Sequence, residues 1–211
     1  AFRPGPNVLC RYQHGDVITA QELMKRIASS PQHEIHCSGG PVQINQKHYQ
    51  GDVSLLKGQG DWLPVVSLDL ETYVASVVGA EMPSNWHEEA LKAQAVAARS
   101  YAMAHLAPAT TASHLGDTTR WQVFAGEQST TPASRSATRE TRGIILSYSG
   151  GIVESLYASN AQVIAEAHGH LGASMSQSGA QQLAHQGLPF NAILGRYYAG
   201  ASLARLTWHD Q

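Results

Sequence analysis

Two consecutive helical patterns in the middle of the chain constrain its fold more than any other feature. From Leu70 onward, apolar residues recur at positions i, i+3, i+4, i+7 and i+8, which predicts an amphipathic helix that ends near Glu81. Pro83 limits this helix, because a proline disfavours helical backbone in the residue before it. A second helix is expected from Glu88 to about Leu106, and its many alanines let another element approach closely. We expect this pair to form the centre of the molecule.

Shorter elements are expected around the two helices. Helices and strands alternate irregularly and hairpins dominate, so the sequence predicts an α+β fold rather than a parallel sheet. A smaller β-rich N-terminal lobe is expected over residues 1–48, and a larger domain with antiparallel strands over 49–211. The individual elements expected are helices at 20–28, 134–142, 176–185 and 190–198, and strands within 31–57 and at 62–66, 121–124, 144–148, 152–158 and 203–208.

Composition excludes several classes of function. Lys and Arg number 14 against 16 Asp and Glu, and no basic block points to a nucleic-acid partner. No apolar run approaches the ~20 residues that span a bilayer. Charged residues make up only 14% of the chain, against roughly 25% in an average domain, and such a surface suits neutral ligands such as sugars. The first residues lack a Met and a signal-peptide core, which is typical of a trimmed or processed chain.

The two cysteines, Cys10 and Cys37, leave three interpretations open. They are too few for a disulfide scaffold, but they could form one bridge in an oxidising compartment. They could instead bind a metal together with His14, His33 and His36, although the spacing matches no standard zinc pattern. The third interpretation is that all five are ordinary polar residues of a small β-rich lobe.

Glu81 is the residue whose predicted position best suits acid catalysis. It ends a hydrophobic helix between Ala80 and Met82. The negative end of the helix macrodipole and the apolar neighbours both disfavour the charged carboxylate, so we expect a raised pKa, which a general acid near neutral pH requires. The alternative is an exposed glutamate that merely ends a helix.

Lys92 and Arg99 are a second pair of candidates. They lie seven residues apart on the second predicted helix, which places them on one face about 10 Å apart along the axis. There they could line a cleft for a negatively polarised polymer. Alternatively they form a solvated stripe in which Glu88 supports Lys92 four residues later.

One long segment of the chain covers residues 70–102 and reads LETYVASVVGAEMPSNWHEEALKAQAVAARSYA. Taken together with several other segments, it resembles the stage II sporulation protein D family, also called SpoIID/LytB. Together the similar segments cover most of the chain from about residue 42 to 204. The others follow in the family's order: YQG at 49–51, DTTRWQVFAG at 117–126, ATRETRGIILSYSGGIVESLYAS at 137–159, MSQSGAQQLA at 175–184 and ILGRYYAG at 193–200.

The resemblance implies a cell-envelope enzyme, with residues 49–211 as its catalytic domain. Active members of the family are lytic transglycosylases that cleave denuded peptidoglycan glycan strands and leave 1,6-anhydro ends. No cofactor is expected for this chain. The glutamate of their Glu-Met-Pro motif is the acid/base, here Glu81, and a lysine and an arginine on the next helix, here Lys92 and Arg99, are implicated in activity. Candidate sugar contacts fall in the family motifs, and each has a local structural alternative: Asp117, Gln122, Tyr157, Ser159, Ser176 and Gln177.

Two departures from the family pattern keep a second function open. Many members carry a zinc site of cysteines and histidines, but Gly116, Arg120 and Trp121 occupy those places here, which predicts no zinc. The segment after Ser159, which normally helps to build the cleft, is short. Both departures favour a peptidoglycan-binding module that enhances a cell-wall amidase. A sugar-binding adaptor in a larger complex is a third possibility.

Overall fold

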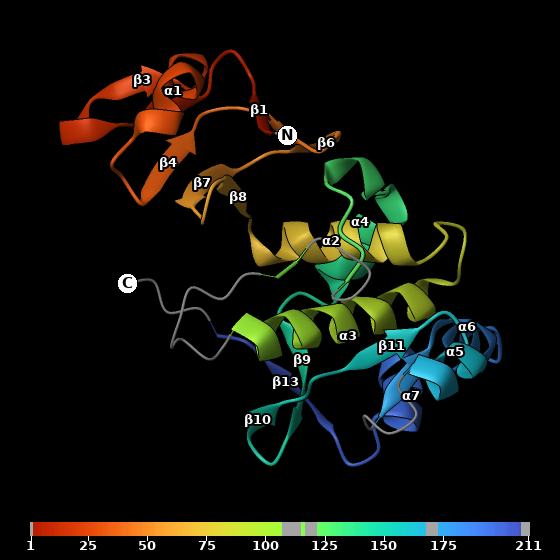
Figure 1. The fold of residues 1–211 in the computed structure, drawn as a ribbon. Coiled ribbons are helices and arrows are strands. Elements are labelled where there is room, and N and C mark those ends of the chain that lie inside the picture. Colours follow the sequence, from red (N-terminus) through yellow and green to blue (C-terminus); the bar gives the residue numbers. More distant parts are fainter. Residues whose placement is uncertain (1, 107–114, 117–121, 168–172, 208–211) are drawn as a thin grey trace. The chain divides into compact units, whose positions relative to one another are not determined.

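The computed structural model describes most of the chain, as an α+β fold (Figure 1). This confirms the predicted fold class. The chain forms two compact units, Ala1–Asp69 with Gly126–Gln128, and Leu70–Ala125 with Ser129–Gln211. The strands between residues 47 and 67 pair within the first of these units. The described residues are 2–106, 115–116, 122–167 and 173–207.

The first unit consists of two small sheets and one helix. One sheet has the strand order β3-β2-β4-β7-β8 and the other the order β1-β5-β6, and the pairs within both are antiparallel. Its strands are β1 (Phe2–Pro4), β2 (Leu9–Arg11), β3 (Val17–Thr19), β4 (Glu34–Ser38), β5 (Val42–Ile44), β6 (Lys47–Tyr49), β7 (Asp52–Lys57) and β8 (Trp62–Ser67). Its helices are α1 (Ala20–Arg26) and short 3₁₀ turns at Gln13–Gly15 and Ile27–Ser29.

The core of this unit follows the alternation of its strands. Ile35 and Cys37 on β4 are buried while their neighbours along the strand are exposed, as a half-buried strand requires. Helix α1 begins after Thr19, whose side-chain oxygen accepts a hydrogen bond from the Glu22 backbone N–H at 3.2 Å. Leu23 of this helix is fully buried. Thr19 is therefore the N-cap of α1.

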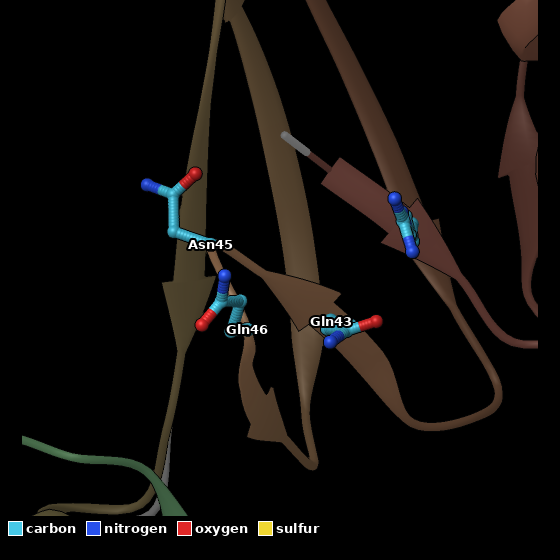
Figure 2. Close-up of a pocket in the computed structure, with 4 residues that line it drawn as sticks. Gln43, Asn45 and Gln46 are labelled. Carbon is cyan, nitrogen blue, oxygen red and sulfur yellow. The ribbon is translucent and has the colours of Figure 1, made fainter.

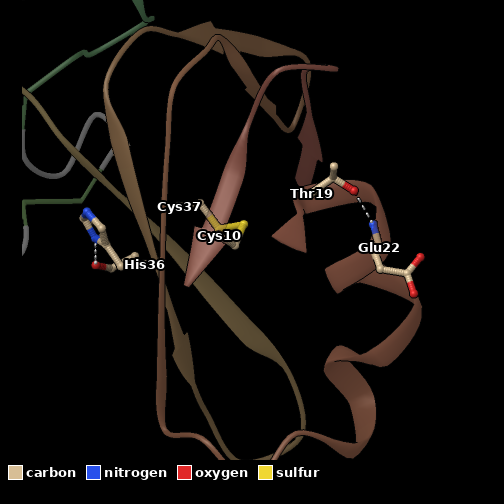
Figure 3. The surroundings of a disulfide bond; sticks show 6 residues. Cys10, Thr19, Glu22, His36 and Cys37 are labelled. Atoms are coloured by element: carbon tan, nitrogen blue, oxygen red, sulfur yellow. Dashed lines mark hydrogen bonds between the residues drawn. A yellow bond between two sulfur atoms is a disulfide. The ribbon is translucent and has the colours of Figure 1, made fainter. Parts of the chain in front are cut away.

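A disulfide joins Cys10 of β2 to Cys37 of β4 (Figure 3). The two residues face each other directly across the antiparallel pair, with their Cα atoms 4.0 Å apart. Both are buried, whereas His36 points to the other face of β4, where its Nδ1 lies 3.4 Å from Ser54 Oγ. Of the three interpretations of these cysteines, the bridge is the one that the structure supports, and such bridges persist in oxidising compartments.

We expect the disulfide to be a major source of stability for the first unit. It links residues separated by 27 positions, and closing a loop of that length is worth about 3–4 kcal/mol, largely by restricting the unfolded chain. The double variant Cys10→Ala/Cys37→Ala should lose about that much free energy of unfolding in urea titrations. Reductant should destabilise the wild type and leave the variant unchanged. Equal stability of the two proteins without reductant would contradict this expectation.

The second unit is built around the two central helices. Helices α2 (Leu70–Glu81) and α3 (Glu88–Leu106) begin and end where the sequence predicts. Helix α3 is buried along most of its length and packs against α2 and several other elements of the unit, as Figure 1 shows. Its alanines allow this, because their small side chains admit close neighbours on several faces. The central position expected for the pair within its domain is therefore confirmed.

The remaining elements of the second unit surround α3. Strands β9 and β13 pair antiparallel, with β10 on the other side of β9, and β11 pairs with β12 in parallel. A further 3₁₀ turn covers Glu127–Ser129. The elements are α4 (Pro132–Glu140), β9 (Ile144–Tyr148), β10 (Gly151–Ile152), β11 (Leu156–Ala158), α5 (Ala161–Ala167), β12 (Ser174–Ser176), α6 (Gln177–His185), α7 (Phe190–Tyr197) and β13 (Ser202–Arg205).

Two of the expected strands differ from the observed ones. The strand predicted at 152–158 is split: its first part closes the hairpin with β9, and its second part, β11, leaves to pair with β12. The buried Ser155 hydroxyl lies at the break and donates a hydrogen bond to the Ala97 carbonyl of α3 at 2.7 Å. The described part of the strand predicted at 121–124 is not a strand, because the Val123 N–H donates to a carboxylate of α2 instead of a neighbouring strand.

Candidate active site

The site is centred on Glu81, the last residue of α2. Its Oε1 accepts a hydrogen bond from the Val123 backbone N–H at 2.9 Å, and its Oε2 accepts one from Gln177 Nε2 at 3.3 Å. Gln177 is the first residue of α6 and is almost completely buried. Tyr73 of α2 holds the Val123 segment in place, since its ring contacts that of Phe124 with centroids 5.0 Å apart. Three parts of the sequence therefore meet at one half-buried carboxylate.

Burial raises the pKa of Glu81 above its ordinary value of 4.5. The hydrogen bonds from Val123 and Gln177 act in the opposite direction, because they stabilise the charged form, but burial outweighs them. The direction agrees with the expectation from sequence, although the cause is mainly loss of solvent. A carboxyl group with a raised pKa is able to hold a proton nearer neutral pH and to give it up to a leaving group.

Tyr157 on β11 is a second group of this neighbourhood. Its hydroxyl is buried and has no hydrogen bond of good geometry among the described residues, although the Gln122 side chain lies close enough to act on its pKa. Burial raises the pKa of Tyr157 well above its ordinary value, and the nearby charges of Glu81 and Tyr73 act in the same direction, so the phenol remains protonated. A buried hydroxyl without a well-formed hydrogen bond is costly in a folded protein, which makes this group a candidate to bind a ligand.

Gln94 of α3 belongs to the site and was missed by the sequence analysis. It is fully buried, and its Oε1 accepts a hydrogen bond from Gln177 Nε2 at 3.4 Å, the same atom that contacts Glu81. Its own Nε2 has no hydrogen-bond partner among the described residues. The only signal for it in the sequence is one amide in a run of alanines, at a position that the helical pattern buries.

The other predicted sugar contacts have structural partners. Gln122 is buried, accepts a hydrogen bond from Tyr73 at 2.9 Å and donates one to the Ala98 carbonyl at 3.1 Å. Ser176 caps α6 by accepting from the Gly179 N–H at 3.1 Å. Ser159 is exposed, and its carbonyl accepts from the Ser178 N–H at 3.0 Å. Asp117, the remaining candidate, lies outside the described residues.

Arg99 is fully buried, and its guanidinium is saturated with protein partners. It forms a bidentate pair with the Glu71 carboxylate, with Nε–Oε1 at 2.9 Å and Nη2–Oε2 at 2.6 Å. Its other donors meet the carbonyls of Ala95, Thr138 and Ile144 at 3.4, 3.4 and 3.0 Å. All five N–H groups of an arginine are thereby occupied. In this structure Arg99 joins α2, α3, α4 and β9 and presents no donor to a ligand.

Lys92 lies in a separate acidic cluster. Its Nζ forms ion pairs with Glu88 of the preceding turn, with Glu89 at 3.0 Å and with Glu140 of α4 at 2.7 Å. Partial burial acts to lower the pKa of Lys92, but the hydrogen bonds that the amine donates to the three carboxylates raise it, so the amine is charged. None of the described interactions joins Lys92 or Arg99 to Glu81. The structure thus brings Tyr157 and Gln177 to Glu81 but not these two cations.

Two features of other functional classes are absent from the described residues. No cluster of three or more His, Cys, Asp or Glu side chains among them is arranged to hold a metal ion. No helix within the same residues is both long and apolar enough to cross a membrane.

Comparison with known proteins shows a likeness to one family. The SpoIID model, described as a stage II sporulation protein, matches residues 58–148, and over this segment the chain is similar to that family. An uncharacterized protein of Brachyspira hyodysenteriae is 32% identical over 117 residues, which is 54% of this chain and 32% of that protein. An amidase enhancer of Bacillus subtilis is 38% identical over 84 residues, which is 40% of this chain and 11% of the enhancer. The chain spans less than a third of either relative.

Proposed function

We propose that this protein is a peptidoglycan lytic transglycosylase of the cell envelope that cleaves bonds between N-acetylmuramic acid and N-acetylglucosamine in denuded strands. The observation that carries the proposal is the half-buried Glu81 carboxylate with its raised pKa, held by Val123 and Gln177 at the end of α2. The match of residues 58–148 to the SpoIID model and the likeness to an amidase enhancer support it. We assign the activity to residues 49–211, with 1–48 as an accessory lobe.

The reaction needs only one carboxyl group. Protonated Glu81 donates its proton to the glycosidic oxygen as an oxocarbenium-like state develops at C1 of the muramic acid. The resulting carboxylate then accepts the proton of the C6 hydroxyl of the same sugar, which attacks C1 and closes a 1,6-anhydro ring. This nucleophile is part of the substrate, so its high effective concentration replaces a second carboxylate that would activate water.

The other site residues have supporting roles in this proposal. Gln177 and Val123 orient the carboxylate, and Gln94 orients the Gln177 amide. The Tyr157 hydroxyl donates to a sugar oxygen. Further proposed sugar contacts are Gln122, Ser159 and Ser176, which also have protein partners. Asp117 is proposed as well and lies outside the described residues. Arg99 and Lys92 act as positioning residues that hold α3 to its neighbours.

We predict that cleavage falls as the pH rises through the raised pKa of Glu81. The first step needs the protonated carboxyl, and burial keeps it protonated above its ordinary value of 4.5. Gln177→Leu removes a donor that stabilises the charged form, so the descending limb of its pH–rate profile should move to higher pH. The control is Gln181→Leu on the same helix, whose descending limb should lie at the same pH as that of the wild type. Movement of the Gln177→Leu limb to lower pH would contradict the assignment.

The contribution of Glu81 to the stability of the folded protein should also decrease as the pH rises. A carboxyl whose folded pKa is raised binds more protons in the folded than in the unfolded state, so its contribution to stability falls as the pH rises from 4.5 through the folded pKa. Glu81→Gln should remove this dependence, which urea titrations at several pH values measure. An equal slope in wild type and variant would contradict the raised pKa.

Incubation of the protein with purified denuded strands, followed by mass spectrometry of the fragments, tests the proposed function. The wild type should produce 1,6-anhydro-muramic ends, and Glu81→Gln should not. Co-sedimentation of both proteins with the same strands separates catalysis from binding. If the wild type binds the strands but does not cleave them, the proposed enzymatic function is refuted.

A second candidate is a peptidoglycan-binding module that enhances a cell-wall amidase. The likeness to the amidase enhancer of Bacillus subtilis and the short segment after Ser159 favour it. Under this alternative, the rate at which an amidase releases stem peptides rises when the protein is added, and Glu81→Gln enhances it equally. A rate enhancement that disappears with Glu81→Gln would favour the enzyme instead.

A further inference from the structure

An open surface cavity of about 340 Å³ lies in the first unit, at the β1–β5–β6 sheet. Its lining residues are Arg3, Gln43, Asn45 and Gln46, of which Figure 2 labels the three amides. All four side chains carry N–H donors and none is acidic. The cavity is large enough for one sugar-sized ligand. It involves no residue of the segment that the family model matches.

The sheet register explains why these side chains gather. Arg3 of β1 is directly opposite Gln43 of β5, so the two side chains lie on the same face of the sheet. Ile44 pairs with Lys47 of β6, which leaves Asn45 and Gln46 as the two-residue turn between the strands. The guanidinium and three amides therefore come from one end of one small sheet, as Figure 2 shows for the amides around the turn.

The turn itself is strained by its sequence. Asn45 and Gln46 have φ values of 49° and 72°, in the left-handed region. A two-residue hairpin of this kind favours asparagine followed by glycine, because a Cβ at the second position crowds the backbone. Gln46 thus occupies a turn position at which glycine is the favoured residue. Such strain is typical of positions that are retained for a ligand.

Three of the four lining side chains are available for a ligand. Among the described residues, Arg3, Gln43 and Gln46 make no side-chain hydrogen bond or ion pair, whereas Asn45 has an interaction of its own. Arg99, in contrast, has every donor occupied. An arginine without a carboxylate partner, next to amides that donate and accept, matches a ligand that combines one carboxylate with hydroxyl or amide groups.

We propose that this cavity, which we call the amide pocket, binds a sugar that carries a carboxylate. The Arg3 guanidinium donates two hydrogen bonds to the carboxylate, and Gln43, Asn45 and Gln46 bind hydroxyl and N-acetyl groups. If the chain acts on denuded glycan strands, the ligand is N-acetylmuramic acid, whose lactyl carboxylate is free in those strands. This identification rests on the proposed function, whereas the carboxylate site rests on the pocket alone.

Titration of the ¹⁵N-labelled full chain with N-acetylmuramic acid tests the proposal by NMR. The side-chain amide signals of Gln43, Asn45 and Gln46 should shift together. N-acetylglucosamine, which has no carboxylate, should bind at least about tenfold more weakly, since a charge-assisted pair is lost. A short acidic peptide that shifts the same signals at lower concentration than the sugar would show that the carboxylate comes from a peptide, and would overturn the assignment to a sugar.

Three variants sharpen the test. Arg3→Gln should weaken the binding of N-acetylmuramic acid at least about tenfold. Arg11→Gln, at an exposed arginine of the same unit, should leave this binding unchanged. Gln46→Gly should raise the melting temperature by relieving the turn and yet weaken binding. Unshifted amide signals, equal affinity for both sugars, or full affinity in Arg3→Gln would overturn the proposal. Binding at the amide pocket without any glycan cleavage would contradict only the proposed function.

Discussion

Glu81→Gln is expected to lower the rate of glycan cleavage by about 10²–10⁴-fold, the usual contribution of one general acid/base. An amide has almost the same shape as the carboxyl group but no proton to give to the leaving oxygen. It still offers an oxygen to the Val123 N–H, whose bond to Glu81 measures 2.9 Å, so the fold and glycan binding should persist. The rate of appearance of new strand ends under saturating substrate measures the effect.

A matched control separates this effect from a general loss of acidic charge. Glu154→Gln removes a carboxylate of the same unit that is 56% exposed and pairs with His105 rather than with the site. Its rate should stay within about a factor of two of the wild type, in line with the small effect of exposed ion pairs. If Glu81→Gln retained more than a tenth of the wild-type rate, Glu81 would not be the acid.

Arg99→Met is expected to lower the free energy of unfolding by about 3–5 kcal/mol, because it leaves the Glu71 carboxylate without its partner in a largely buried place. Glu71 also contacts the residue before β9, because its Oε1 accepts a hydrogen bond from the Gly143 N–H at 3.1 Å. Urea or thermal unfolding of the purified variant measures the loss. Arg139→Met, at an exposed arginine of α4, is the control, with a change within about 0.5 kcal/mol.

The double variant Arg99→Met/Glu71→Leu tests the cause of this loss. Both charges are then removed, and apolar replacements of buried pairs often restore stability, so the double variant should be more stable than Arg99→Met alone. An Arg99→Met protein of wild-type stability that fails to cleave glycan would contradict the structural role. That result would place Arg99 among the residues that touch the substrate.

The parts of the fold that were predictable from sequence depend on local patterns. The ends of α2 and α3 follow from the apolar period and from Pro83, which act within a few residues. The cap at Thr19 is equally local. The raised pKa of Glu81 was also predictable in direction, since a hydrophobic helix end already places the carboxyl group among apolar neighbours.

The parts that were not predictable depend on contacts between distant segments. The Val123 N–H and the Gln177 amide meet Glu81 across 42 and 96 positions of sequence, and no local period encodes either contact. The pairing of β11 with β12 is parallel and non-local, which is why a simple hairpin was expected in its place. The partners of Arg99 were hidden for the same reason, because helical spacing gives the face of a side chain but not what packs against it.

Product analysis in H₂¹⁸O tests the central claim most directly. Denuded strands are cleaved by the wild-type protein in labelled water, and the new muramic ends are examined by mass spectrometry. The proposed mechanism predicts 1,6-anhydro ends without ¹⁸O, because the C6 hydroxyl of the sugar and not water attacks C1. Reducing ends that carry ¹⁸O would contradict it and would make the protein a hydrolase.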